Sequence, residues 1–480
     1  MLEPGQVCRR PRPDRPTAQP AAARSRIASR GPDRPPIGSV VPATVSSPRS
    51  PDLLVHTLPN GVRAVAIPLA QRATAAVSVF LRSGSQHEPK LLNGIGHVVE
   101  HMVFKGTRTR DAARINLDAE RLGAEVNAHT DKDHSGFHLH GLTADAGTFV
   151  HLLADLLLAP TFPADELERE RQVLLQEFAE DEDDPMATAY RLFDRAGWGA
   201  HPVAQPAIGV RANVERFTRE ELAAWVARQV SGCNLVVAAA GAVDPERWLR
   251  EVEQAFGGLP QGSPNTVETP AWAGGVRTRV LAGSSQAHLV LGWPVPPLAA
   301  DDPLPELAAV LFGEGMSAPL MAELRERRGL VYYAACAADV LDGSGSWVVE
   351  ASCAPGRLEE LLAALPPLLM AQAERVDPAQ LDRARRQLIV RWLREHDQPA
   401  RRLEAAALDL FALGRVRSAV ERRERVEAVG AAELSGSVAR LLDAGAAAGL
   451  AGQLGRQATA RVQAGLAPLL HQVPSAINPR

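Results

Sequence analysis

An apolar run that carries two imidazoles and one carboxylate reads Gly94-Ile95-Gly96-His97-Val98-Val99-Glu100-His101-Met102-Val103-Phe104. Its apolar residues recur three and four positions apart, which predicts a helix. On a helix, His97 and His101 lie one turn apart on one face, which is the spacing of two zinc ligands. Glu100 flanks the same face and could act as a base on a metal-bound water without being a ligand. The order H-x-x-E-H is the inverse of the more common zinc-binding order H-E-x-x-H.

This short pattern is only moderately specific by itself. Histidines on apolar helices are more often core residues than ligands, and with 13 histidines in 480 residues the pattern is expected by chance about 0.02 times. The context of the run in the rest of the chain therefore decides its interpretation.

The composition is that of an ordinary globular protein, 46% hydrophobic and 22% charged, with room for about two to four domains. A net charge of −4 gives no basic field, so neither nucleic acid nor an anionic membrane is an expected partner. No run of about 18 apolar residues predicts a membrane span. The four cysteines are scattered without paired spacing, which argues against a disulfide framework or a cysteine metal site.

Residues 1–52 differ in composition from the rest, since proline, arginine, serine and alanine dominate. They lack the apolar segment of a secretory signal, and although the arginine-rich, acid-poor composition resembles an organelle leader, the prolines would break an amphipathic helix. We expect a disordered tail, or an upstream start that the cell does not use, and a cytoplasmic protein. Residues 471–480 are expected to form a second tail.

Strand and helix patterns alternate in blocks from residue 53 onward. A hairpin is expected around Pro59-Asn60-Gly61, and apolar alternation predicts strands at 75–81, 122–130, 135–142 and 235–240. Helices are predicted over 144–158, over 165–183 and from Asp244-Pro245 onward, where the aspartate caps the helix and the proline takes its first position. The fold class is therefore α+β.

The helix predicted over 165–183 carries two carboxylates where core residues are expected. Leu167 and Leu174 form one row of its apolar stripe. The adjacent row, three residues after each leucine, consists of Glu170 and Glu177. An exposed acidic face explains the other acidic residues of this helix but not these two. Because an unpaired buried carboxylate costs several kcal/mol, a cation is expected beside them.

The second half of the chain repeats the first. We expect one domain over 53–260, a linker over 261–274 and a similar domain over 275–470, because residues 345–391 follow the same order of elements as residues 136–177. Aligning the leucines of the two charged helices places Ala384 at the position of Glu170 and Arg391 at that of Glu177. The second copy also lacks H-x-x-E-H, so one metal site per chain is expected, in the first half.

The extended run from Asn93 to Thr107 resembles the signature of the pitrilysin or insulinase family of zinc peptidases, which includes the mitochondrial processing peptidases. The similarity spans about residues 53–470. It implies two homologous α/β-sandwich domains that form a clam-like chamber around one zinc ion.

The resemblance also assigns roles to residues. It implies zinc ligands at His97, His101 and Glu177, support from Glu170, and proton transfer by Glu100. It implies a substrate-holding edge strand at Asn127-Ala128, and an arginine and a tyrosine from the second half, matched by Arg325 and Tyr332. Residues 313–317 resemble the glycine-rich loop of that family. The chain departs from the family pattern just after this loop, where Pro319 takes the place of the usual arginine.

The function implied is that of a zinc-dependent endopeptidase acting on peptides or unfolded segments. The alternative is a non-catalytic or partner-dependent subunit of the same fold, in a homodimer or with a paralogous chain; such subunits typically lose the metal residues, which this chain keeps. A serine hydrolase has little support because no G-x-S-x-G motif is present. His138 and His140 share one strand face and could pair on a metal, although such histidines are usually solvated.

Overall fold

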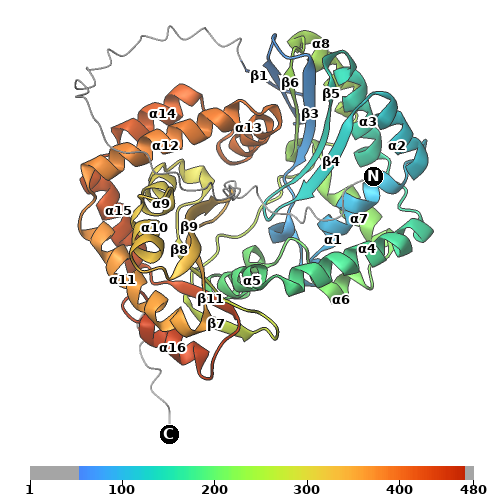
Figure 1. The fold of residues 1–480 in the computed structure, drawn as a ribbon. Helices are drawn as coiled ribbons and strands as arrows, with labels where there is room; N and C mark the ends of the chain where they lie inside the picture. Colours follow the sequence, from blue (N-terminus) through green and yellow to red (C-terminus); the bar gives the residue numbers. More distant parts are fainter. Residues whose placement is uncertain (1–52, 471–480) are drawn as a thin grey trace, which may run out of the picture.

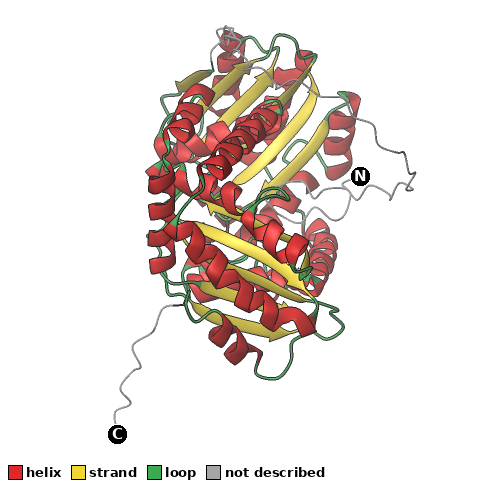
Figure 2. Ribbon diagram, turned by 60° about the vertical axis from the view of Figure 1, so that its left-hand side comes forward, coloured by secondary structure: helices red, strands yellow, loops and turns green. Residues whose placement is uncertain are grey.

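A computed structural model describes residues 53–470. The tails expected at 1–52 and 471–480 lie outside the described residues. The described chain forms two halves that lie side by side, each built on one mixed β-sheet with helices packed against it (Figures 1 and 2).

The sheet of the first half has six strands in the order β1-β2-β6-β3-β5-β4. Their bounds are β1 Leu54–Thr57, β2 Arg63–Pro68, β3 Thr74–Leu81, β4 Glu125–Thr130, β5 Ser135–Leu142 and β6 Leu235–Gly241. Only the β2–β6 pair is parallel. Strand β4 lies at one end of the sheet, so one of its edges has no neighbouring strand among the described residues.

The second sheet repeats this order without the counterpart of β1. Its strands are β7 Gly275–Val280, β8 Ala287–Pro294, β9 Val331–Val340, β10 Gly345–Cys353 and β11 Ala447–Gly452. They are arranged as β7-β11-β8-β10-β9, and only β7 and β11 are parallel. The expectation of two similar α/β halves is therefore confirmed.

One face of each sheet is covered by helices of its own half. In the first half these helices are α1 Ile95–Met102, α2 Ala112–Arg121, α3 Ala146–Leu158, α4 Ala164–Asp183, α6 Arg211–Val214, α7 Arg219–Gln229 and α8 Pro245–Phe256. In the second half they are α9 Leu304–Gly313, α10 Pro319–Met321, α11 Leu358–Glu374, α12 Pro378–His396, α14 Ala419–Ala428, α15 Ala431–Asp443 and α16 Ala458–Gly465. Each group buries one large apolar core against its sheet.

The other face of each sheet is covered by a helix from the opposite half (Figure 1). Helix α5, Pro185–Gly197, packs Ala189 and Phe193 against the second sheet. Helix α13, Pro399–Leu413, packs Leu403 and Leu410 against the first sheet. This exchange joins the two halves through buried apolar side chains.

Two glycines in the second sheet allow α5 to approach it closely. A Cβ built on Gly449 would lie 2.0 Å from the carbonyl oxygen of Ala189, and one on Gly292 would lie 3.0 Å from the ring of Phe193. Any larger residue at position 449 must therefore move the helix backbone away from the sheet.

Two elements differ from the sequence-based expectation. The strand expected over 122–130 starts at Glu125, because Gly123 adopts a left-handed turn (φ +60°) after α2. The apolar helix around His97 ends at Met102 and continues as one 3₁₀ turn over Val103–Lys105. Between residues 53 and 470, no helix is both long enough and apolar enough to cross a membrane.

We expect Gly449→Ala to lower the free energy of unfolding by about 1–3 kcal/mol, the usual cost of overpacking a buried contact. The measurement is the midpoint and slope of denaturant unfolding. Gly343→Ala is the matched control, because a Cβ at that exposed turn position meets no atom within 4 Å. Equal stabilities of the two variants would contradict the close packing of α5.

Candidate functional site

The start of helix α1 is fixed by a buried carboxylate, Glu88, which is 1% exposed. Its Oε2 accepts hydrogen bonds from the backbone N–H of Gly94 (2.7 Å) and from Asn93 Nδ2 (2.9 Å), and its Oε1 accepts one from the N–H of Gly96 (2.8 Å). A carboxylate suits the positive end of a helix and satisfies N–H groups that have no partner within it.

Burial raises the pKa of Glu88 to about 7, although the hydrogen bonds from Gly94, Gly96 and Asn93 act in the opposite direction. No pattern in the sequence indicates this residue. Its distance from the helix start, six residues before Gly94, fits no local capping pattern, so only the folded chain brings it there.

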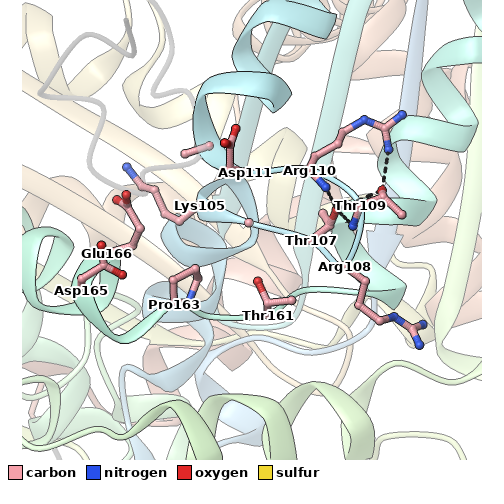
Figure 3. Close-up of a pocket in the computed structure, with 12 residues that line it drawn as sticks. Lys105, Thr107, Arg108, Thr109, Arg110, Asp111, Thr161, Pro163, Asp165 and Glu166 are labelled. Atoms are coloured by element: carbon pink, nitrogen blue, oxygen red, sulfur yellow. Dashed lines mark hydrogen bonds between the residues drawn. The ribbon is translucent and has the colours of Figure 1, made fainter.

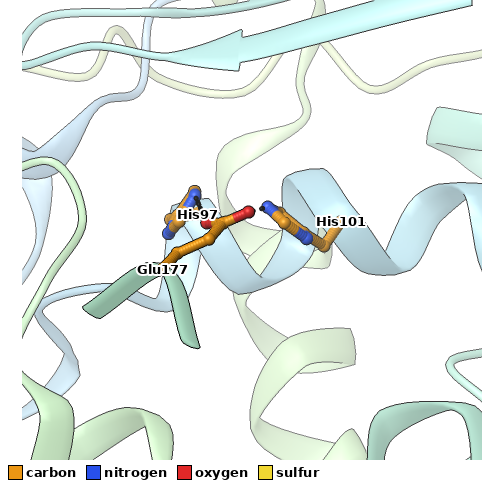
Figure 4. Close-up of side chains that lie close together, drawn as sticks. All are labelled: His97, His101 and Glu177. Atoms are coloured by element: carbon orange, nitrogen blue, oxygen red, sulfur yellow. Dashed lines mark ion pairs between the residues drawn. The ribbon is translucent and has the colours of Figure 1, made fainter. Parts of the chain in front are cut away.

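Helices α1 and α4 bring together His97, His101 and Glu177 (Figure 4). The Oε2 atom of Glu177 lies 3.5 Å from His97 Nε2 and 3.7 Å from His101 Nε2. The two imidazoles meet edge to face, with ring centroids 4.8 Å apart. One carboxylate oxygen therefore faces one nitrogen of each ring.

The geometry of these three groups fits a zinc ion. Glu177 Oε2 is buried without a hydrogen-bond partner, and its separations from the two nitrogens are too long for hydrogen bonds. Zinc bonds of about 2.0–2.1 Å in a tetrahedral arrangement place neighbouring ligand atoms about 3.4 Å apart, close to the separations found here. A cation would satisfy the buried oxygen.

The protonation states suit such a cation. Burial, with a smaller contribution from His101, lowers the pKa of His97 to about 3, so its ring is neutral and has a lone pair to offer. Burial also raises the pKa of Glu177 above its usual value. This carboxylate is therefore destabilised as long as no cation neutralises it.

Glu170 orients the second histidine. Its Oε1 lies 2.9 Å from His101 Nδ1, and its Oε2 lies 2.5 Å from Lys105 Nζ. Burial acts to raise the pKa of Glu170, but the hydrogen bonds with His101 and Lys105 outweigh it and lower that pKa. A carboxylate on Nδ1 fixes the tautomer of His101 and directs its Nε2 towards Glu177. Lys105 is a further residue of this site that no sequence pattern indicates.

Glu100 lies on α1 between the two histidines and is buried. Burial acts to lower the pKa of His101, but the carboxylates of Glu170, Glu100 and Glu177 together raise it. Glu100 is thus close enough to His101 to act on it electrostatically.

The loop that follows Lys105 is held by internal hydrogen bonds and borders a surface hollow (Figure 3). The hydroxyl of Thr107 accepts hydrogen bonds from the backbone N–H groups of Thr109 and Arg110, and the Arg110 guanidinium donates to Thr109 and Asp155. These contacts order the chain directly after Lys105, whose Nζ contacts Glu170.

Helix α12 of the second half corresponds to α4 of the first, but it carries a positive charge at the position of Glu177. Ala384 is fully buried on α12, where α4 has Glu170. Arg391, at the position of Glu177, donates to Glu306 and Glu314 at 2.8 Å each. Neither of the two groups of potential metal ligands found in residues 53–470 includes this position.

The expected substrate residues lie in both halves. Asn127 and Ala128 are on the edge strand β4, and the side chain of Asn127 accepts a hydrogen bond from the N–H of Ala128. In the second half, the guanidinium of Arg325 lies 5.0 Å from the ring centroid of Tyr332, which is 73% exposed. The other contacts of Arg325, with Met316 and Glu326, also lie within that half.

Pro319 occupies the first position of the short helix α10, where its missing N–H is not needed.

Of the histidines considered for a second metal, His138 forms hydrogen bonds with Ser78 and His129, whereas His140 is half exposed and lies 4.0 Å from Glu125. The structure therefore does not join His138 and His140.

The fold and the site define an α/β protein of two similar halves, with a potential metal centre in the first. The family model described as Insulinase (Peptidase family M16) matches residues 64–210, and that of the Peptidase M16 inactive domain matches residues 216–388. An uncharacterized zinc protease of Mycobacterium leprae is 34% identical over 332 residues, which cover 68% of this chain and 74% of that protein. An uncharacterized zinc protease of Mycobacterium tuberculosis is also 34% identical, over 339 residues that cover 69% of this chain and 76% of that protein. The chain belongs to peptidase family M16, the insulinase family.

Solved structures agree with this fold. A peptidase M16 inactive domain from Pseudomonas fluorescens superposes with a TM-score of 0.77 at 20% identity, covering 84% of this chain and 98% of that one. A protease from Helicobacter pylori gives a TM-score of 0.76 at 21% identity, with coverages of 84% and 99%.

We expect Glu88→Gln to lower the free energy of unfolding by about 1–3 kcal/mol, because the amide NH₂ cannot accept the hydrogen bonds that one carboxylate oxygen now accepts. Thermal or denaturant unfolding measures the change. Glu246→Gln is the control, since Glu246 also lies in the first turn of a helix but is exposed. A loss of similar size in both variants would show that Glu88 has no special role at the start of α1.

Proposed function

We propose that this chain is a zinc-dependent endopeptidase that cleaves peptides or unfolded segments. The observation that carries the proposal is the buried Oε2 of Glu177, which has no hydrogen-bond partner and faces one nitrogen each of His97 and His101. Relatives that carry the name zinc protease support the same metal and the same class of reaction.

In this proposal His97, His101 and Glu177 hold the metal and leave a fourth position open, as in catalytic zinc sites. Zinc, when bound, supplies a Lewis acid that lowers the pKa of water and polarises a peptide carbonyl. Glu100 accepts the proton of the attacking water and later donates it to the leaving amine. Glu170 keeps His101 in the tautomer that metal binding requires.

The substrate would bind as an added strand along the open edge of β4, at Asn127 and Ala128. Main-chain hydrogen bonds of this kind tolerate many side chains, which suits unfolded segments. Tyr332 and Arg325, presented by the second half, would reach the substrate across a chamber between the halves. There the tyrosine hydroxyl would stabilise the developing oxyanion and the guanidinium would hold the peptide backbone.

We expect Glu100→Gln to keep its zinc and to lose peptidase activity by about 10²–10⁴-fold or more, because an amide cannot accept the proton of water. Cleavage of a quenched fluorescent peptide library and elemental analysis of the same sample measure both effects. The control is Glu120→Gln, an exposed glutamate on α2.

Loss of zinc in Glu100→Gln would make Glu100 a ligand rather than a base. Retention of both zinc and activity would place the catalytic base elsewhere. A purified wild-type chain that holds zinc but cleaves no peptide would favour the alternative of a partner-dependent or non-catalytic subunit.

We expect Glu177→Gln to lose its metal and Glu170→Gln to bind it about 10–100-fold more weakly, because the first change removes a ligand and the second removes the support of one. Competition with a chromophoric zinc chelator measures both affinities. Wild-type affinity in Glu177→Gln would refute its role as a ligand.

A further inference from the structure

A second group of potential metal ligands lies on the opposite face of the first sheet, where α13 of the second half covers it. It consists of His129 on β4, His134 in the turn before β5, and Glu404 on α13. No residue of this group belongs to the site described above. The sequence does not indicate this group, because Glu404 lies 270 residues beyond His134 and only the fold brings them together.

The three ligand atoms are spaced like the corners of a zinc site. His129 Nε2 lies 3.2 Å from His134 Nε2, and Glu404 Oε1 lies 3.3 Å from His134 Nε2 and 3.7 Å from His129 Nε2. Tetrahedral zinc with bonds of about 2.0–2.1 Å separates its ligand atoms by about 3.4 Å. The distances and the nitrogen–nitrogen–oxygen set therefore fit one ion placed among them.

Each of the two histidines also has a hydrogen-bond partner at Nδ1, the ring nitrogen that faces away from the cluster. His134 Nδ1 lies 2.7 Å from the buried carboxylate of Asp133, and His129 Nδ1 lies 3.0 Å from His138 Nε2. His138 is fixed in turn by Ser78, 2.8 Å from its Nδ1. Outer hydrogen bonds of this kind select the tautomer that presents Nε2 to a metal.

A glycine makes room for this arrangement. The rings of His129 and His138 stack with their centroids 5.0 Å apart. A Cβ on Gly136 would lie 2.5 Å from His129 and 2.7 Å from His138, so a side chain at this position would displace both rings. The missing side chain at Gly136 thus leaves room for the two stacked rings, and the hydrogen bond between them fixes their arrangement.

We propose that His129, His134 and Glu404 bind a second divalent transition-metal ion, zinc by preference, that fastens helix α13 of the second half to the edge of the first sheet. The carboxylate and two imidazoles are ligands that zinc favours. His134 is 1% exposed, whereas His129 and Glu404 are 30% and 24% exposed, which leaves a route for the ion from solvent.

The site would act beside the strand proposed to hold substrate. His129 follows Asn127 by two residues on β4, so both side chains lie on the same face of the strand. A metal bond to Glu404 would then fix the position of this strand relative to the second half. The role is structural, since the ion would join two elements that the fold already packs together.

The metal-free alternative is an imidazolium at His134 shared between two carboxylates. Burial acts to lower the pKa of His134, but Asp133 and Glu404 raise it to about 10. In that state the cluster is a buried ion pair and binds no metal, so metal stoichiometry separates the two states directly.

The test is a zinc titration of the full-length chain after removal of bound metal with a chelator, with bound zinc counted by elemental analysis after gel filtration. We expect Glu404→Gln to bind one zinc equivalent fewer than the wild type, and His129→Gln to show the same loss. His140→Gln, an exposed histidine on the neighbouring strand β5, should bind as many equivalents as the wild type. Because the result is a difference, it does not depend on whether His97, His101 and Glu177 bind zinc.

Thermal unfolding provides a second measurement on the same variants. Added zinc should raise the melting temperature of the wild type and of His140→Gln more than that of Glu404→Gln, because a ligand that binds only the native state stabilises it. Equal stoichiometry in the wild type, Glu404→Gln and His129→Gln would overturn the proposal. If one of these variants does not fold, by circular dichroism, the other decides.

Discussion

The structure depends on the need to cover both faces of two sheets whose central strands are apolar and fully buried. Every residue of β6 and of β11 is buried, so neither strand has a face that water can solvate. The helices of each half cover one face only. The second face is covered by α13 in the first half and by α5 in the second, and neither half completes its core without the other.

This exchange explains several features that no single half explains. The strands under the exchanged helices carry alanine and glycine where a helix backbone comes close, as Gly449 does under Ala189. The guanidinium of Arg63, on β2, donates to the carbonyl of Leu410 on α13 and lies 4.9 Å from the ring centroid of Phe411. Polar contacts thus follow where apolar burial has already placed the helix. The same placement brings Glu404 to two histidines of the first half.

The two halves also show how one backbone can support different chemistry. Helices α4 and α12 present leucines to their cores at equivalent positions. Each packs against a helix that precedes the edge strand of its sheet, α1 in the first half and α9 in the second. In the first half, the positions three residues after each of these leucines are Glu170 and Glu177, whose carboxylates face imidazoles. In the second half, an alanine and an arginine replace them, and Arg391 is neutralised by Glu306 and Glu314. The presence of a potential metal centre therefore depends on a few side chains and not on the architecture around them.

The sequence by itself determined the α+β class, the internal repeat and the insulinase family, because these rest on local periodicity and on a contiguous motif. It also singled out Glu170 and Glu177, since two carboxylates in an apolar stripe violate a pattern that can be read within one helix. The sequence did not indicate Glu88 at the start of α1, Lys105 at Glu170, the exchange of α5 and α13, or the cluster of His129, His134 and Glu404. Each of these arises from contacts that no local pattern indicates, so only the tertiary structure decided them. Burial of the second face of each sheet places α5 and α13, and with α13 it brings Glu404 to the two histidines.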